Sequence, residues 1–181
     1  MVMALLPAIE QRESKRSFLP DPIPPSMLHD LLEALRWAPS CRNYQPWRVV
    51  VVESKVSLAK LAQCLAKGNE WAAKAPMAFI VSADPKDDAT IDGKEYYFFD
   101  CGLAVQNLLI QATALGLCSH PTAGWNEESL KKTFAINENQ RVLSVVFVGL
   151  PGSLSDLDAE TRAKDETPRI RKPIEEWTHF V

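Results

Sequence analysis

Apolar residues follow two periodicities along the chain, and together they predict helices that alternate with strands. The stretch Asp100 to Cys118 is apolar around most of a helical surface, and Gly116 is a natural stop near its end. We expect this stretch to form the central helix of one domain, buried on nearly all sides. The alternative is that part of its surface is buried against a second subunit. It is too interrupted to span a membrane, which requires about 20 continuous apolar residues.

The remaining elements follow from the spacing of apolar residues and from capping residues. Helices are predicted at Met3–Gln11, at Met27–Ala38 with Ser26 as N-cap, at Leu58–Ala66 with Ser57 as N-cap, and from Asn126 or Glu127 to about Phe134. Buried strands are predicted at Arg48–Glu53, Met77–Ala83 and Val142–Leu150. This alternation is typical of a mixed α and β domain in which helices pack on a sheet, here one domain spanning residues 1–181.

The segments between these elements are rich in proline, glycine or charge. We expect loops at Pro39–Trp47, Asp84–Gly93 and His120–Trp125, and an exposed polar segment at Ser153–Pro168. The tail Ile174–Val181 contains Trp177 and Phe180, which a solvated terminus rarely carries. We therefore expect the tail to dock on its own subunit or on a neighbour.

Composition excludes several classes of function. The net charge is −3 and no long basic run occurs, which disfavours nucleic-acid binding. The 4 cysteines form no CxxC motif, so we expect free thiols and no metal site. The N-terminal apolar patch is too short for a signal peptide, and we expect a cytoplasmic protein without a membrane segment.

Neither common glycine-rich phosphate loop, GxGxxG or GxxxxGK[ST], occurs in the chain. A phosphorylated ligand would therefore have to be bound by side chains. Arg12 and Arg16 with Ser14 near one end, and Arg169 and Arg171 near the other, could do this, because guanidinium groups form paired bonds to phosphate. Each cluster taken alone is equally compatible with solvated surface charge.

Two loops could contact the rest of such a ligand. Ser40, Asn43 and Gln45 offer hydrogen bonds to a polar heterocycle beside the rigid ring of Pro39. In Pro121–Gly124, glycine allows the backbone to approach a flat ligand closely. The alternatives are an ordinary connecting loop and a tight turn.

The order of these motifs resembles the FMN-dependent nitroreductase family over nearly the whole chain. The motifs that carry the resemblance are Arg12-x-Ser14-x-Arg16-x-Phe18, Pro39-Ser40-x-x-Asn43-x-Gln45-Pro46-Trp47, Gly68-Asn69-x-Trp71 with Ala75-Pro76, Asp100-x-Gly102-x-Ala104-x-Gln106-Asn107-Leu108, and Arg169-x-Arg171-x-Pro173. The resemblance implies a mixed β-sheet flanked by helices and an intertwined homodimer with FMN at the subunit interface. It also implies NADH or NADPH as electron donor and a small-molecule electron acceptor.

The resemblance also assigns roles to residues. Arg12, Ser14, Arg16, Arg169 and Arg171 would bind the phosphate and ribityl end, while Pro39, Ser40, Asn43 and Gln45 would reach the flavin from the other subunit. Asn69 would lie near the pyrimidine edge, and Pro121, Thr122, Ala123 and Gly124 along the ring near its redox-active nitrogen. No side chain would act as a catalytic acid or base, and no metal would take part.

Some positions depart from the family pattern or remain open. Many members carry an acidic residue where this chain has Ala123, so the substrate range differs or the backbone provides the contact. Cys41 is either an incidental small residue or a redox modulator, and either Arg12 or Lys74 would favour the reduced anionic flavin. Alternative functions are reductive dehalogenation, flavin processing, a non-enzymatic FMN-binding module, and a flavin-free relative.

Overall fold

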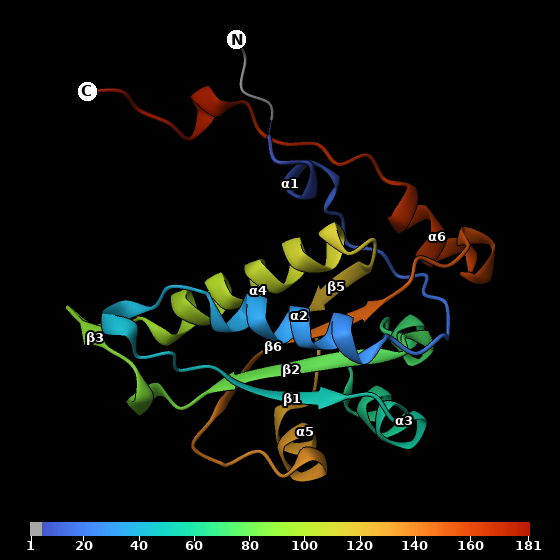
Figure 1. Cartoon of the computed structure of the whole chain (residues 1–181), viewed down its shortest axis with the longest axis horizontal. Coiled ribbons are helices and arrows are strands. Elements are labelled where there is room, and N and C mark those ends of the chain that lie inside the picture. Colours follow the sequence, from blue (N-terminus) through green and yellow to red (C-terminus); the bar gives the residue numbers. More distant parts are fainter. Residues whose placement is uncertain (1–4) are drawn as a thin grey trace.

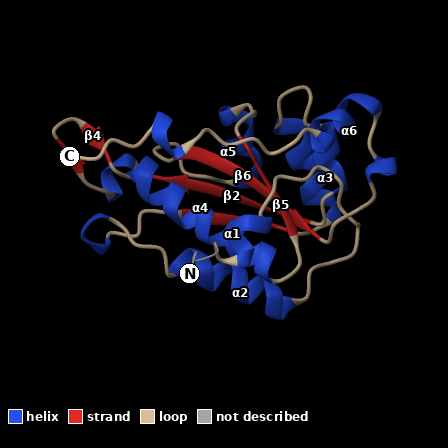
Figure 2. Cartoon of the chain, turned by 90° about the horizontal axis from the view of Figure 1, so that it is seen from above, coloured by secondary structure: helices blue, strands red, loops and turns tan. Residues whose placement is uncertain are grey.

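The computed structural model describes residues 5–181 as a sheet with helices on both faces (Figures 1 and 2). The helices are α1 (Pro7–Gln11), α2 (Pro25–Arg36), α3 (Lys55–Cys64), α4 (Tyr97–Ala114), α5 (Glu127–Phe134) and α6 (Ala159–Glu166). The strands are β1 (Arg48–Val52), β2 (Met77–Ala83), β3 (Thr90–Ile91), β4 (Lys94–Glu95), β5 (Cys118–Thr122) and β6 (Arg141–Gly149). Short 3-10 helices are η1 (Cys41–Asn43), η2 (Glu70–Lys74), η3 (Pro85–Asp87), η4 (Leu154–Asp156) and η5 (Ile174–Glu176).

The main sheet has the order β1-β2-β6-β5, and its neighbouring strands are antiparallel. Every residue of β2 is buried, because the strand is central and both of its faces are covered. Phe79 of β2 packs with Val146 of β6 against α2 and α4, while Ile80 and Phe147 point into the opposite core beside α3 and α5. The α+β class with helices flanking a sheet is therefore confirmed. The expected mixed sheet also contains parallel pairing, which here is an isolated bridge between Ser14 and Ser119.

Helix α4 crosses one face of the sheet and buries one side only. Its buried positions, among them Ala104, Leu108 and Ala112, recur every three or four residues. On the opposite side, Phe99 is 62% exposed, and Gly102 and Gln106 farther along the helix are also exposed. The expectation that the helix is buried on nearly all sides is thus wrong for one chain, which leaves the alternative that its free side meets a second subunit.

The end of α4 agrees with the prediction, whereas the N-caps of α2 and α3 differ from it. Gly116 has a φ of +74°, which confirms it as the residue that ends the helix. The predicted caps Ser26 and Ser57 are wrong: α2 begins at Pro25 after Pro24, and the Ser54 side chain caps α3 by accepting from the Ser57 backbone N–H. Proline suits the first turn of a helix, since its missing N–H would have no partner there.

The helix predicted from Met3 begins only at Pro7, and Met3 itself lies outside the described residues. The helix predicted from Asn126 or Glu127 is confirmed as α5, with Asn126 as its N-cap accepting from the Ser129 backbone N–H.

Two segments predicted to be irregular contain regular structure. The expected loop after His120 begins inside β5, and Pro121 is tolerated there because β5 is an edge strand whose proline needs no ladder donor. The polar segment 153–168 contains η4 and α6. Helix α6 has few apolar residues, so hydrophobic periodicity could not indicate it.

The C-terminal tail does not dock on its own chain. Trp177 is 68% exposed and Phe180 is 85% exposed, and Figure 1 shows the tail leading away from the sheet past α1. The expectation that the tail docks on its own subunit is therefore wrong, and the alternative that it docks on a neighbouring subunit stays a prediction.

Within residues 5–181, every helix is either too short or too polar to cross a bilayer. The same residues contain no group of three His, Cys, Asp or Glu side chains that could hold a metal ion.

The packing of α4 on the sheet predicts a large loss of stability for Leu108→Ala. Leu108 is fully buried between α4 and the sheet, so the substitution removes apolar contacts and leaves a cavity costing about 2–5 kcal/mol. Val56→Ala is the control, because Val56 is 68% exposed. Urea unfolding at one protein concentration measures both, and equal midpoints for the two variants would contradict the packing described.

Candidate functional site

Three arginines drawn from both ends of the chain form the first part of the site; we call Arg12, Arg169 and Arg171 the arginine cluster. Arg169 donates from both terminal nitrogens, to the backbone oxygen of Arg12 at 2.6 Å and to that of Glu10 at 2.7 Å. The Arg12 guanidinium reaches the Ser14 hydroxyl at 3.4 Å. The two segments predicted to act together are therefore in direct contact, although they lie at opposite ends of the sequence.

The arginine cluster is electrostatically frustrated. Burial lowers the pKa of Arg12, and the positive charges of Arg171 and Arg169 lower it further. None of the three arginines forms a salt bridge within residues 5–181. Side chains of like charge that converge without a carboxylate partner suit a dianionic ligand group such as phosphate.

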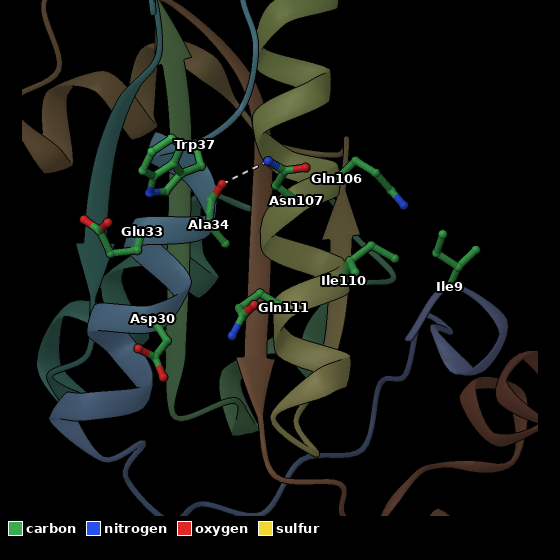
Figure 3. A pocket seen from close by; sticks show the side chains of 9 residues that line it. All are labelled: Ile9, Asp30, Glu33, Ala34, Trp37, Gln106, Asn107, Ile110 and Gln111. Atoms are coloured by element: carbon green, nitrogen blue, oxygen red, sulfur yellow. Dashed lines mark hydrogen bonds between the residues drawn. The ribbon is translucent and has the colours of Figure 1, made fainter. Parts of the chain in front are cut away.

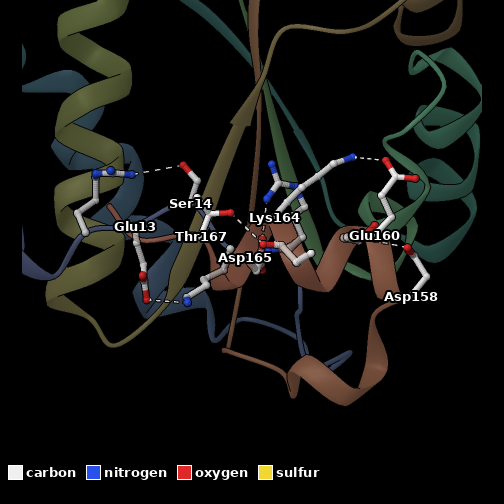
Figure 4. A network of polar contacts seen from close by, with 12 residues as sticks. Glu13, Ser14, Asp158, Glu160, Lys164, Asp165 and Thr167 are labelled. Atoms are coloured by element: carbon white, nitrogen blue, oxygen red, sulfur yellow. Dashed lines mark hydrogen bonds and ion pairs between the residues drawn. The ribbon is translucent and has the colours of Figure 1, made fainter. Parts of the chain in front are cut away.

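Arg16 lies close to this cluster but is already paired. Its guanidinium donates to Asp165 Oδ1 at 2.6 Å, and its backbone N–H donates to Asp165 Oδ2 at 2.8 Å. Figure 4 shows Asp165 on α6 among the contacts that link this helix to the segment around Ser14. Arg16 therefore offers only its remaining donors to a ligand.

Two polar side chains of β5 beside this segment lack partners. Ser119 is 1% exposed and His120 is 9% exposed, and neither Ser119 Oγ nor His120 Nδ1 has a hydrogen-bond partner within the described residues. The His120 ring lies 4.5 Å from the Trp71 ring, centroid to centroid. Burial, together with the positive charge of Arg16, lowers the pKa of His120 to about 4, so the ring is neutral at physiological pH.

The end of β5, the turn that follows it, and Asn69 just before η2 form the second part of the site. Thr122 Oγ1 donates to Asn69 Oδ1 at 3.4 Å, and the Gly124 backbone N–H donates to Thr122 Oγ1 at 3.5 Å. A Cβ atom on Gly124 would lie 3.1 Å from Asn69 Nδ2 and 3.1 Å from Ala66 Cβ. A larger residue at this position would be tightly packed against both side chains, so glycine favours this close approach. Asn69 contacts the turn with which it was predicted to act. Ala123 is exposed beside it.

Residues 39–47 form the third part, which we call the proline loop. The Ser40 hydroxyl accepts from the Gln45 backbone N–H at 2.9 Å, and the Gln45 side chain donates to the Asn43 backbone oxygen at 3.2 Å. Asn43 and Gln45 have positive φ values of 60° and 51°, a conformation that costs free energy for residues other than glycine. Pro39, Asn43 and Gln45 are exposed, so this strained loop presents its polar groups outward.

The proline loop is far from the other two parts within one chain. It is tied to the start of α4, where Asp100 Oδ2 accepts from the Cys41 backbone N–H at 2.6 Å. The other two parts lie on different elements: the segment that follows α1, the end of β5, and Asn69 just before η2. Figure 1 shows the loop at the end of the molecule that carries β3, away from α6. A single chain therefore does not bring all predicted site residues together.

A groove of about 670 Å³ follows the exposed side of α4 (Figure 3). Asn107 and Gln111 of α4 point toward α2, whereas Gln106 and Ile110 point toward Ile9 of α1. Glu33 of α2 and Trp37, which follows that helix, line the other side of the groove. Trp37 is 73% exposed, which is unusual for tryptophan on a free surface. This groove continues the apolar side that α4 leaves open.

Sequence reasoning missed three residues of the site. His120 was assigned to a loop, Ser119 carried no motif, and Asp165 lay in a segment regarded as solvated. Lys74, considered as a positive charge near the flavin, donates to the Asp156 backbone oxygen at 2.6 Å instead. The available signal for Asp165 was its charge: a chain with several predicted binding arginines can use a nearby acidic residue to pair with one of them.

The chain is similar to a known family over most of its length. The sequence profile described as the nitroreductase family matches residues 9–70 and 59–150. A Thermus thermophilus protein named NADH dehydrogenase is 36% identical, over 91% of this chain and 90% of that protein. An Archaeoglobus fulgidus protein with the provisional name NADH dehydrogenase/NAD(P)H nitroreductase is 30% identical, over 95% of this chain and 98% of that protein.

A solved structure supports the same relationship. A crystal structure described as an oxidoreductase containing FMN has a TM-score of 0.85 with this fold, and is 27% identical over 99% of this chain and 92% of that one. The arrangement of strands and helices is thus shared along with the sequence.

The buried, neutral His120 predicts a stability that falls in acid. The unfolded state takes up a proton near the ordinary histidine pKa of 6.5, whereas the folded state does so only near 4. Stability from this residue is therefore present above pH 6.5 and is lost as the pH falls toward 4, by an amount on the order of a few kcal/mol.

Chemical denaturation of wild type and His120→Gln at about pH 7 and about pH 5 measures this difference. We expect the wild type to lose more stability than the variant between the two values. An identical loss in both proteins would mean that His120 is not the titrating group.

Proposed function

Because the chain belongs to the nitroreductase family, we propose that it is an FMN-dependent NAD(P)H oxidoreductase that reduces small electrophiles such as nitroaromatics or quinones. The donor and the acceptor would use the same site in turn, in a ping-pong order. The observation that carries this proposal is the arginine cluster, three converging guanidinium groups without a carboxylate partner among the described residues.

The chemistry of the residues fits a phosphorylated flavin. The arginine cluster would bind the phosphate, with Ser14 donating to the phosphate or the ribityl chain and Arg16 contributing its remaining donors. The unpartnered hydroxyl of Ser119 and the unpartnered Nδ1 of His120 are buried polar atoms that a ligand or water could satisfy. FMN, when bound, would supply the two-electron redox chemistry between nicotinamide and acceptor.

The remaining residues would orient the ring. Asn69 and the turn Pro121 to Gly124 would lie along it, with the Gly124 position allowing close backbone approach. Ala123 leaves this part of the site without a carboxylate, so the neighbouring backbone N–H groups would provide its hydrogen bonds. Neutral His120 adds no second positive charge beside Arg16 at physiological pH.

We infer that a homodimer completes the site. Among the described residues no hydrogen bond joins the proline loop to the arginine cluster, and the loop lies at the β3 end of the molecule, so Pro39, Ser40, Asn43 and Gln45 would have to come from a second copy. The exposed side of α4, the groove beside Trp37 and the exposed tail aromatics provide the apolar surface that such a dimer would bury. The 4 free cysteines are consistent with a reducing, cytoplasmic environment.

The assignment of the phosphate site predicts that Arg169→Ala with Arg171→Ala weakens FMN binding at least about tenfold, because two charge-assisted contacts are lost. Quenching of flavin fluorescence on titration measures the affinity. Lys60→Ala with Lys132→Ala is the control, since it removes the same charge from exposed positions on α3 and α5. Equal affinity of the arginine variant and the control would contradict the assignment.

The dimer proposal predicts that Ile110→Lys yields monomers, because it introduces a charge into the groove along α4. Val56→Lys makes the same change at an exposed position of α3 and should remain dimeric. Sedimentation velocity measures the mass, and flavin titration should show that the monomer loses FMN affinity. A dimeric, flavin-binding Ile110→Lys variant would rule out this interface.

Turnover separates the alternatives. The proposed activity predicts that the yellow protein oxidises NADH or NADPH when a quinone or nitroaromatic is present. Bound flavin without nicotinamide oxidation above background would instead indicate a binding module, and turnover only with halogenated substrates would indicate reductive dehalogenation.

A further inference from the structure

Asp165 is a buried carboxylate whose role the proposed function does not use. Its side chain is fully shielded from solvent, and it accepts two hydrogen bonds from one residue: the Arg16 guanidinium at 2.6 Å and the Arg16 backbone N–H at 2.8 Å. Burying a carboxylate is costly unless it is paired and hydrogen-bonded, and Arg16 meets both conditions. A single carboxylate therefore fixes both the main chain and the side chain of Arg16.

This contact joins the two chain ends that provide the arginine cluster. Arg12 lies four residues before Arg16, and Arg169 lies four residues after Asp165. Helix α6 is held on the body of the protein by Arg162, which donates to the Leu154 and Leu157 backbone oxygens. It ends at Glu166, so the segment that carries Arg169 leaves α6 directly beside the Asp165 contact. The pair thus determines how the two arginine segments align.

The charge distribution agrees with this role. Asp165 pairs with Arg16, whereas Arg12, Arg169 and Arg171 form no salt bridge among the described residues. The Arg169 contacts to the Arg12 and Glu10 backbone oxygens require the two segments to lie in register. Without the Asp165 anchor, mutual repulsion would favour separation of these segments.

We propose that Asp165 is a positioning residue that, through Arg16, aligns Arg169 and Arg171 with Arg12 and thereby sets the preference for FMN over riboflavin. This inference rests on the proposed function, because it assumes that the arginine cluster binds the flavin phosphate. Riboflavin lacks that phosphate, so its affinity should depend on the ring contacts and not on the alignment of the arginines.

The test compares FMN and riboflavin titrations of the flavin-free protein, followed by quenching of flavin fluorescence. For Asp165→Asn, which is nearly isosteric, we expect the Kd for FMN to rise at least about tenfold, while that for riboflavin changes less than about twofold. Retained riboflavin binding also shows that the variant is folded. Glu166→Gln is the matched control, with the same charge change at the next, exposed residue of α6 and an unchanged Kd for both flavins.

A double-mutant cycle tests whether Asp165 acts through Arg16. Arg16→Gln should also weaken FMN binding, and the double variant should lose little beyond either single variant, because the two residues form one unit. Additive losses would overturn the inference, as would an unchanged ratio of the two flavin affinities or an equal fall in both. If the wild type binds neither flavin, the proposed function itself fails; if it prefers FMN and Asp165→Asn keeps that preference, only this inference fails.

Discussion

Mutual repulsion among Arg12, Arg169 and Arg171 is the constraint on which the site depends. Three guanidinium groups converge without a carboxylate partner among the described residues, and burial lowers the pKa of Arg12 further. Such an arrangement persists only when other contacts hold it. Here they are the bonds of Arg169 to two backbone oxygens and the Arg16–Asp165 pair, which together tie the N-terminal segment to α6. The positive potential is thus built into the fold before any anion arrives.

The sheet explains why this potential lies where a flat ligand can use it. Strand β5 is the edge of the main sheet, and the Ser14 segment runs beside it through the bridge to Ser119. An edge strand leaves backbone groups available, and Pro121 limits further strand pairing there. The edge therefore leads from the arginine cluster past His120 to Asn69 and Gly124. Charge at one end and amide groups at the other match a ligand with a phosphate and a polar ring.

Periodicity predicted most of the fold because the buried elements are strongly apolar. The strands that became β1, β2 and β6, and the helix that became α4, all carry patterns that solvent exposure would penalise. Helix α6 and β5 escaped prediction for opposite reasons: α6 is polar because it buries little, and β5 contains a proline that only its edge position tolerates. The N-caps Ser26 and Ser57 were misassigned because proline or an earlier serine takes the first turn.

The site residues illustrate the same limit. The family resemblance assigned Arg12, Ser14 and Arg169 to one site, and the structure joins them by hydrogen bonds. Their binding of a phosphate stays a prediction. Motif spacing could not find Asp165 or His120, because a buried carboxylate or imidazole differs from a solvated one only through tertiary contacts. The conformation of the proline loop was also beyond motif spacing. Ser40 and Asp100 accept hydrogen bonds from its backbone N–H groups, and Asn43 and Gln45 have positive φ and exposed side chains. The proposed dimer would cover this loop and the exposed side of α4, to which Asp100 ties it.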